Sequence, residues 1–124
     1  MPENQTEASR YTSKYGGNFV SASQFIAEIV CERIAAKQGK NLPVKFWNII
    51  TWKKSFMIQL LAANSLLKIY KSQAILAGLK RSPKTYTLHA NWLIELFDEE
   101  QSKLVELEAK KNTNKIDLLK PIES

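Results

Sequence analysis

The residues with the clearest chemical bias are lysines and arginines, and they are concentrated in the middle of the chain. The 62 residues from Arg33 to Ile94 contain eleven basic side chains and not one aspartate or glutamate. Protein surfaces normally mix both signs, because interspersed charges reduce self-repulsion. An acid-free stretch of this length therefore predicts a surface that meets a polyanion.

The flanking segments carry the opposite bias. Residues 1–32 hold two basic and four acidic side chains, and residues 95–124 hold five basic and eight acidic ones. The overall net charge of +6 therefore understates the basic character of the centre. The competing interpretation is structural: the helix after residue 91 starts with acidic residues, and folding back would neutralise part of the basic surface.

We expect contacts with nucleic acid to come from residues 45–84. Lys53 and Lys71 fall at the same angle of a helical wheel, eighteen residues or about 27 Å apart. A lysine pair in the first turn of a helix opposes the helix dipole, and a bound phosphate would favour it. The candidate contact residues are Lys45, Lys53, Lys54, Lys68, Lys71, Gln73, Lys80, Arg81 and Lys84.

The segment 52–88 resembles a helix-turn-helix with a wing, in its architecture alone. In such modules the second helix enters the major groove, and the hairpin that follows touches the flanking backbone. A short helix 73–81 would place Gln73, Ala77, Lys80 and Arg81 outward, and these long donors can reach bases or phosphates. The alternative is a connecting helix whose Ala74, Ala77 and Gly78 simply pack closely on a neighbour.

Two aromatic residues interleave with the lysines outside the expected core stripes. Trp47 and Tyr86 are candidates for stacking on single-stranded bases. Trp52, Phe56 and Tyr70 fall on the apolar stripe of a long helix, where packing explains them.

Catalysis has little support in the sequence. Glu28 and Glu32 share a helix face, but a metal-dependent nuclease needs carboxylates that converge on the scissile phosphate, and these lie outside the basic window. His89 has no identifiable partner, and Cys31 fits a small buried residue. One cysteine and one histidine cannot make a disulfide or a zinc site. We expect no cofactor and no resident metal.

Helical periodicity and caps position these residues. Ser21 and Gln24 form a capping box, and Gly39 suits the residue after a helix end, which predicts a helix over 22–38. Residues 44–48 suggest one helical turn, and Thr51 caps a helix over 52–70. Ser72 caps helix 73–81, the β-branched run 84–88 predicts a short extended segment, and Asn91 caps helix 92–111.

The sequence therefore predicts an all-α domain of four principal helices over residues 15–111, between a disordered tail 1–14 and a flexible tail 112–124. Its expected function is non-catalytic nucleic-acid binding, DNA more than RNA, as a regulator or replication accessory factor. The alternatives are an adaptor that docks an acidic protein, or a small metal-dependent nuclease. Helix 92–111 is a candidate surface for a protein partner or a homodimer. No apolar run approaches the ~20 residues of a membrane span, and no secretory signal is visible, so we expect no membrane partner and an intracellular location.

Overall fold

The computed structural model describes residues 11–17 and 19–119, with the side chains of those up to residue 110. The chain begins with a small hairpin in which β1 (Tyr11–Thr12) pairs with β2 (Phe19–Val20). The pairing is antiparallel, with Tyr11 opposite Val20. Among the described residues the rest of the regular structure is helical, so the prediction of an all-α domain with four principal helices is confirmed.

The first long helix, α1 (Ala22–Lys37), has the predicted cap at Ser21, whereas the side chain of Gln24 donates to Glu28. The hydroxyl of Ser21 accepts a hydrogen bond from the backbone N–H of Gln24, 3.2 Å away. At the other end Gly39 has a φ of +72°, which glycine adopts without strain. The N–H of Lys40 reaches back to the carbonyl of Ala35 at 2.8 Å and closes the turn.

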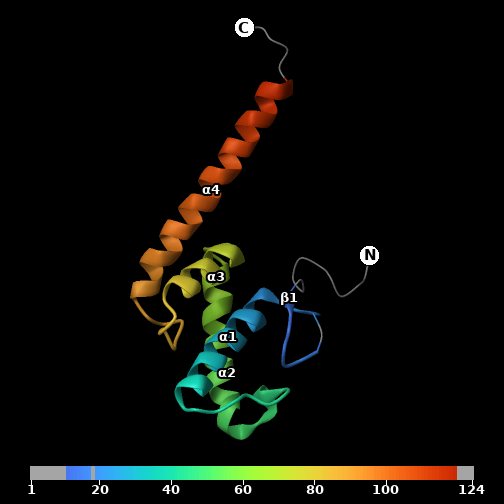
Figure 1. Cartoon of the computed structure of the whole chain (residues 1–124), viewed down its shortest axis with the longest axis vertical. Helices are drawn as coiled ribbons and strands as arrows, with labels where there is room; N and C mark the ends of the chain where they lie inside the picture. Colours follow the sequence, from blue (N-terminus) through green and yellow to red (C-terminus); the bar gives the residue numbers. More distant parts are fainter. Residues whose placement is uncertain (1–10, 18, 120–124) are drawn as a thin grey trace.

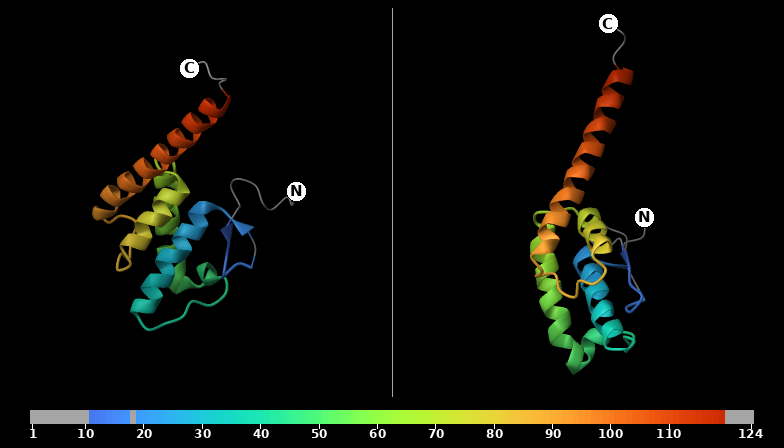
Figure 2. Two further views of the ribbon diagram at one scale, coloured as in Figure 1. Left: turned by 45° about the horizontal axis from the view of Figure 1, so that its top comes forward. Right: turned by 60° about the vertical axis from the view of Figure 1, so that its left-hand side comes forward.

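After a loop and a single 3₁₀ turn, η2 (Phe46–Asn48), the chain forms α2 (Ile50–Leu67) and α3 (Ser72–Arg81). α2 packs beside α1, and α3 lies across the end of the pair (Figures 1 and 2). The helix predicted over 52–70 thus begins and ends earlier. The cap predicted at Thr51 is wrong, because the residue before the helix is Ile49 and no side chain caps it.

The last helix, α4 (Trp92–Leu119), packs on α3 with its first turns and then leaves the body of the molecule (Figure 1). Its length overturns the helix end predicted at residue 111, since the backbone stays helical into the predicted tail 112–124. At the other terminus Tyr11 and Thr12 form β1, although both were assigned to the N-terminal tail. Residues 1–10 and 120–124 lie outside the described part of the chain.

The extended segment predicted over 84–88 is also wrong. Residues 82–91 form an irregular loop with two turns. The backbone groups of this loop bond to side chains of the helices instead of a neighbouring strand. The amide oxygen of Gln59, on α2, accepts the N–H of Leu88 at 2.8 Å. This loop is held against the body and forms no wing.

The buried side chains form two clusters. The larger lies between the four helices and includes Ile26, Val30, Ile75, Leu93 and Phe97, none of them exposed by more than 1 %. The smaller lies under η2 and contains Ala27, Cys31, Phe46 and Phe56. These clusters set the positions of the basic side chains around them.

Candidate nucleic-acid interface

Four exposed lysines gather at the end of the molecule where α1 stops, η2 turns and α2 starts (lower end in Figure 1). Lys40 follows the glycine turn that ends α1, and Lys45 precedes η2. Lys53 and Lys54 come directly after the first turn of α2. We call this group, Lys40, Lys45, Lys53 and Lys54, the lysine tip.

The backbone at Lys45 is held in an unusual conformation. Its φ of +53° is left-handed, which costs energy for any residue with a Cβ. The Lys45 N–H donates to the carbonyl oxygen of Tyr15 at 2.9 Å, and this bond ties the loop to the N-terminal hairpin. The loop conformation leaves the Lys45 side chain exposed.

A ring cluster beneath the tip fixes η2. Phe46 is fully buried and meets Tyr15, Trp52 and Phe56 edge to face, with ring centroids 5.3, 6.1 and 5.5 Å apart. Trp47 packs on Phe56 with centroids 5.4 Å apart. The indole that the sequence proposed for base stacking is thus engaged in intramolecular packing.

The start of α2 adds positive potential to the tip. No side chain caps this helix end, and its first turn contains no acidic residue. The N-terminal end of a helix carries a partial positive charge, so Lys53 and Lys54 raise a potential that is already unfavourable for cations. None of the four tip lysines forms an ion pair with a carboxylate of the described residues.

Other basic residues of the predicted surface are neutralised by α4. The Lys71 ammonium lies 2.6 Å from Glu108, and the Arg81 guanidinium lies 2.8 Å from Glu99 and 3.0 Å from Glu100. Hydrogen bonds with Glu99, then with Glu100, raise the pKa of Arg81. Hydrogen bonds from Lys103 and Arg81 hold the pKa of Glu100 below its usual value. The structure thus contains the back-folded acidic helix that the sequence offered as the competing interpretation.

The small residues of α3 serve packing. Ala74 and Gly78 are buried, and a Cβ on Gly78 would lie 2.6 Å from the Phe97 ring. Gln73 and Lys80 remain exposed on α3, as predicted. The nine candidate residues therefore do not form one continuous group: Lys45, Lys53 and Lys54 lie at the tip, and Lys68, Lys71, Gln73, Lys80, Arg81 and Lys84 lie on the later elements.

Two further cations of the acid-free window have structural partners. The Arg33 guanidinium donates to the carbonyl oxygens of Leu79, Ser82 and Thr85 at 2.7, 3.0 and 3.3 Å, and burial lowers its pKa. The Lys37 ammonium lies over the Tyr86 ring, 4.5 Å from its centroid. Tyr86, the second stacking candidate, is therefore covered by a lysine. Lys40 is the one tip residue that the predicted set lacks. The glycine turn before it, which ends α1, could have indicated its position in the sequence.

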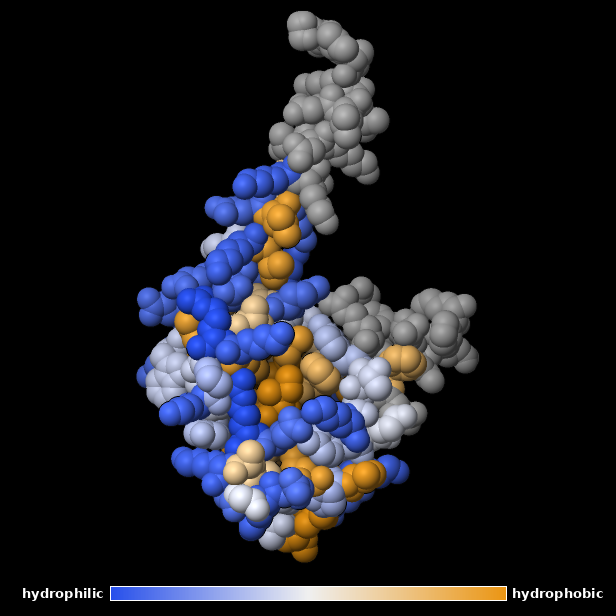
Figure 3. All heavy atoms as spheres, in the orientation of Figure 1, coloured by the Kyte–Doolittle hydropathy of each residue, from blue (hydrophilic) through white to orange (hydrophobic). Residues whose placement is uncertain are grey.

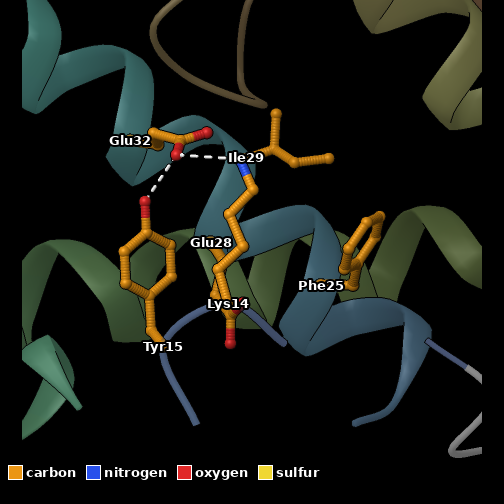
Figure 4. A pocket seen from close by; sticks show the side chains of 6 residues that line it. All are labelled: Lys14, Tyr15, Phe25, Glu28, Ile29 and Glu32. Carbon is orange, nitrogen blue, oxygen red and sulfur yellow. Dashed lines mark hydrogen bonds and ion pairs between the residues drawn. The ribbon is translucent and has the colours of Figure 1, made fainter. Parts of the chain in front are cut away.

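The paired carboxylates of α1 line a cavity of about 230 Å³ beside the hairpin (Figure 4). Glu28 is 3 % exposed and accepts hydrogen bonds from Ser13 and Gln24, while Tyr15 and Lys14 both contact Glu32. Burial raises the pKa of Glu28. These bonds attach the hairpin to α1 and give both Glu28 and Glu32 a structural role.

The other potential catalytic groups are not assembled. Among the described residues, no three His, Cys, Asp or Glu side chains come close enough to hold a metal ion. His89 is exposed, and burial raises the pKa of the Cys31 thiol to about 12.

Comparisons with known protein families, curated proteins and solved structures give no match to this chain. In the described part of the chain, no helix combines the length and apolarity that crossing a membrane requires.

Proposed function

We propose that this protein binds nucleic acid through the phosphate backbone, without catalysing a reaction, and that the lysine tip makes the main contacts. The observation that carries the proposal is a set of four exposed lysines, around an uncapped helix start, that form no ion pair with any described residue. Phosphate oxygens are the ligands that such a group of ammonium ions and backbone N–H groups favours.

The distribution of ion pairs supports the tip over the α3 surface. Lys71 and Arg81 would have to exchange a carboxylate of α4 for a phosphate, whereas the tip lysines have no carboxylate partner among the described residues. Gln73 and Lys80 remain available for additional contacts once the tip has docked. We place DNA ahead of RNA, and an intracellular location and a role as regulator or replication accessory factor belong to the same proposal.

The tip also carries aliphatic side chains. Ile50 is 87 % exposed and Val44 69 %, and Figure 3 shows apolar side chains at this end, bordered by hydrophilic ones. Apolar residues beside lysines also suit an anionic lipid surface. The test of function therefore includes vesicles, although the proposal is for nucleic acid and against a membrane partner.

The test is fluorescence anisotropy with labelled duplex DNA, single-stranded DNA and duplex RNA at several salt concentrations. If the four tip lysines engage phosphates, log K should fall against log salt with a slope of about −3.6, from ~0.9 for each contact. A slope flatter than about −1, or no binding at low salt, would contradict the proposal.

A matched pair of variants locates the surface. Lys45→Gln, Lys53→Gln and Lys54→Gln together should flatten the slope by about 2.7. The control, Lys14→Gln, Lys103→Gln and Lys110→Gln, removes the same charge outside the acid-free window and should leave the slope within about 1 of the original. Binding to phosphatidylserine vesicles or polyglutamate without binding to any polynucleotide would overturn the proposal.

A further inference from the structure

The outer face of α2 is exposed and carries two large aliphatic side chains between lysines. Lys54, Ile58, Leu61, Ser65 and Lys68 are all exposed, and their spacing of 4, 3, 4 and 3 residues places them on one side of the helix. Ile58 is 41 % exposed and Leu61 59 %. We call these five residues the α2 stripe.

Beside the α2 stripe runs a groove. Two adjoining hollows of about 270 and 320 Å³ share Ala62, Ser65 and His89. Ile58 and Leu61 bound one hollow, and Ile94, at the start of α4, bounds the other. The lining combines small and aliphatic side chains with His89, and a groove of this kind suits an amphipathic helix.

α4 carries a second exposed face with large aliphatic side chains. Val105 lies eleven residues after Ile94, about three helical turns, so both project from the same side of α4. They are 52 % and 45 % exposed, and Glu95 and Glu106 stand next to them in sequence. Figure 3 shows apolar side chains among hydrophilic ones where α4 extends beyond the body.

The two faces have opposite charge and follow one another along the molecule. α2 contains no carboxylate and its stripe carries lysines, whereas Glu95 and Glu106 of α4 form no ion pair with the described residues. α4 leaves the body near the end at which α2 finishes and continues away from it (Figures 1 and 2). Two copies laid side by side in opposite directions would therefore place α4 of each copy against α2 of the other.

We propose that the occupant of this groove is α4 of a second copy of this chain, in an antiparallel dimer with twofold symmetry. One contact, used twice, covers the α2 stripe and the Val105 side of α4 in both copies, and such isologous contacts close the assembly. A pairing of α2 with α2 is disfavoured, because it would set lysines against lysines.

Sedimentation velocity from about 1 to 300 μM protein, without nucleic acid, tests the dimer. We expect a mass twice the 14.2 kDa of one chain. Lys54→Glu with Lys68→Glu should raise the dissociation constant at least ~tenfold, and so should Glu95→Lys with Glu106→Lys. The control, Lys53→Glu with Lys84→Glu, makes the same charge change off the stripe and should leave the dimer intact.

Mixing the two disruptive variants gives the decisive result. In the mixed dimer both contacts again join opposite charges, so a one-to-one mixture should recover the wild-type mass. A wild-type chain that stays monomeric at 300 μM, or a mixture that stays monomeric, would overturn the proposal. So would a dimer that both charge reversals leave unchanged.

Discussion

Gly78 of α3 packs directly against Phe97 of α4, and replacing it with alanine tests that contact. The added Cβ would lie 2.6 and 2.8 Å from two carbons of the Phe97 ring, well inside van der Waals contact. Phe97 is fully buried, and its ring also meets Tyr70 with centroids 5.5 Å apart. The ring is therefore held by neighbours other than Gly78.

Two opposing effects set the change in unfolding free energy that Gly78→Ala causes. Alanine in place of glycine within a helix stabilises by about 1 kcal/mol, because the unfolded chain loses less entropy on folding. Overpacking a filled core costs about 1–3 kcal/mol. Since the obstructing ring is fully buried, we expect the upper part of that range and a net loss of about 1–2 kcal/mol in the free energy of unfolding.

Urea denaturation followed by circular dichroism measures this loss. The companion variant Phe97→Leu removes the obstructing ring edge, and the double variant should be less destabilised than the sum of the two single changes, by about 1 kcal/mol. A gain of about 1 kcal/mol for Gly78→Ala alone, as at an unobstructed helical position, would refute the close contact between α3 and α4.

Three further predictions follow from named contacts. Arg33→Met should cost about 2–3 kcal/mol in unfolding free energy by urea titration, because three carbonyl groups lose a charged donor, and Arg33→Lys should restore little since it lacks the planar fork. Burial raises the pKa of Glu28, so this residue contributes fully to stability below its ordinary pKa of 4.5, and the contribution is lost as pH rises through the folded-state pKa. Glu28→Gln should remove the resulting decline in melting temperature. An unchanged pH profile of the melting temperature would contradict the raised pKa of Glu28. Glu99→Gln with Glu100→Gln frees Arg81, and affinity for random duplex should rise about two- to fivefold at low salt, chiefly through the association rate. Unchanged affinity with intact circular dichroism would show that α4 does not restrain the basic surface.

The parts of the fold that the sequence predicts are those fixed by neighbouring residues. Ser21 and Gly39 mark the two ends of α1 through bonds within a few positions, and these two predictions are confirmed. The start of α2 was missed because no polar cap marks it. It is set by Phe46, which packs on Trp52 and Phe56 across the turn, and such tertiary packing overrides local propensity.

The loop 82–91 was misassigned for a related reason. Its β-branched and aromatic residues favour an extended conformation, but its backbone partners are the side chains of Arg33 and Gln59. These lie 49 and 29 residues before the groups they bind. No local sequence pattern reveals these distant hydrogen bonds. They take the place of the hydrogen bonds that a strand would make to a neighbouring strand.

The charge pattern located the basic surface but not the pairing within it. Lys71 meets Glu108 across 37 residues, and Arg81 meets Glu100 across 19, so neither ion pair is visible in a local window. Lys53 and Lys54 were predicted because they oppose the dipole of their own helix, which is a local argument, and they remain unpaired among the described residues.

The lysine tip and the proposed dimer constrain one another, because Lys54 belongs to both, and the dimer leaves Lys40, Lys45 and Lys53 of each tip for phosphates. In an antiparallel pair the tips point away from each other, since each lies at the end of the molecule opposite to its own α4. Such a dimer cannot place both tips on adjacent phosphates, but it can hold two separate segments of a polynucleotide. Binding would then depend on the effective concentration of the second segment, and a long duplex would bind more tightly than two short ones of the same total length. The monomeric variants Lys54→Glu with Lys68→Glu also alter the tip, whereas Glu95→Lys with Glu106→Lys leave it intact. Glu95→Lys with Glu106→Lys therefore separates dimer formation from phosphate binding at the tip. If both proposals hold, this variant loses the preference for long duplex and still binds short duplex.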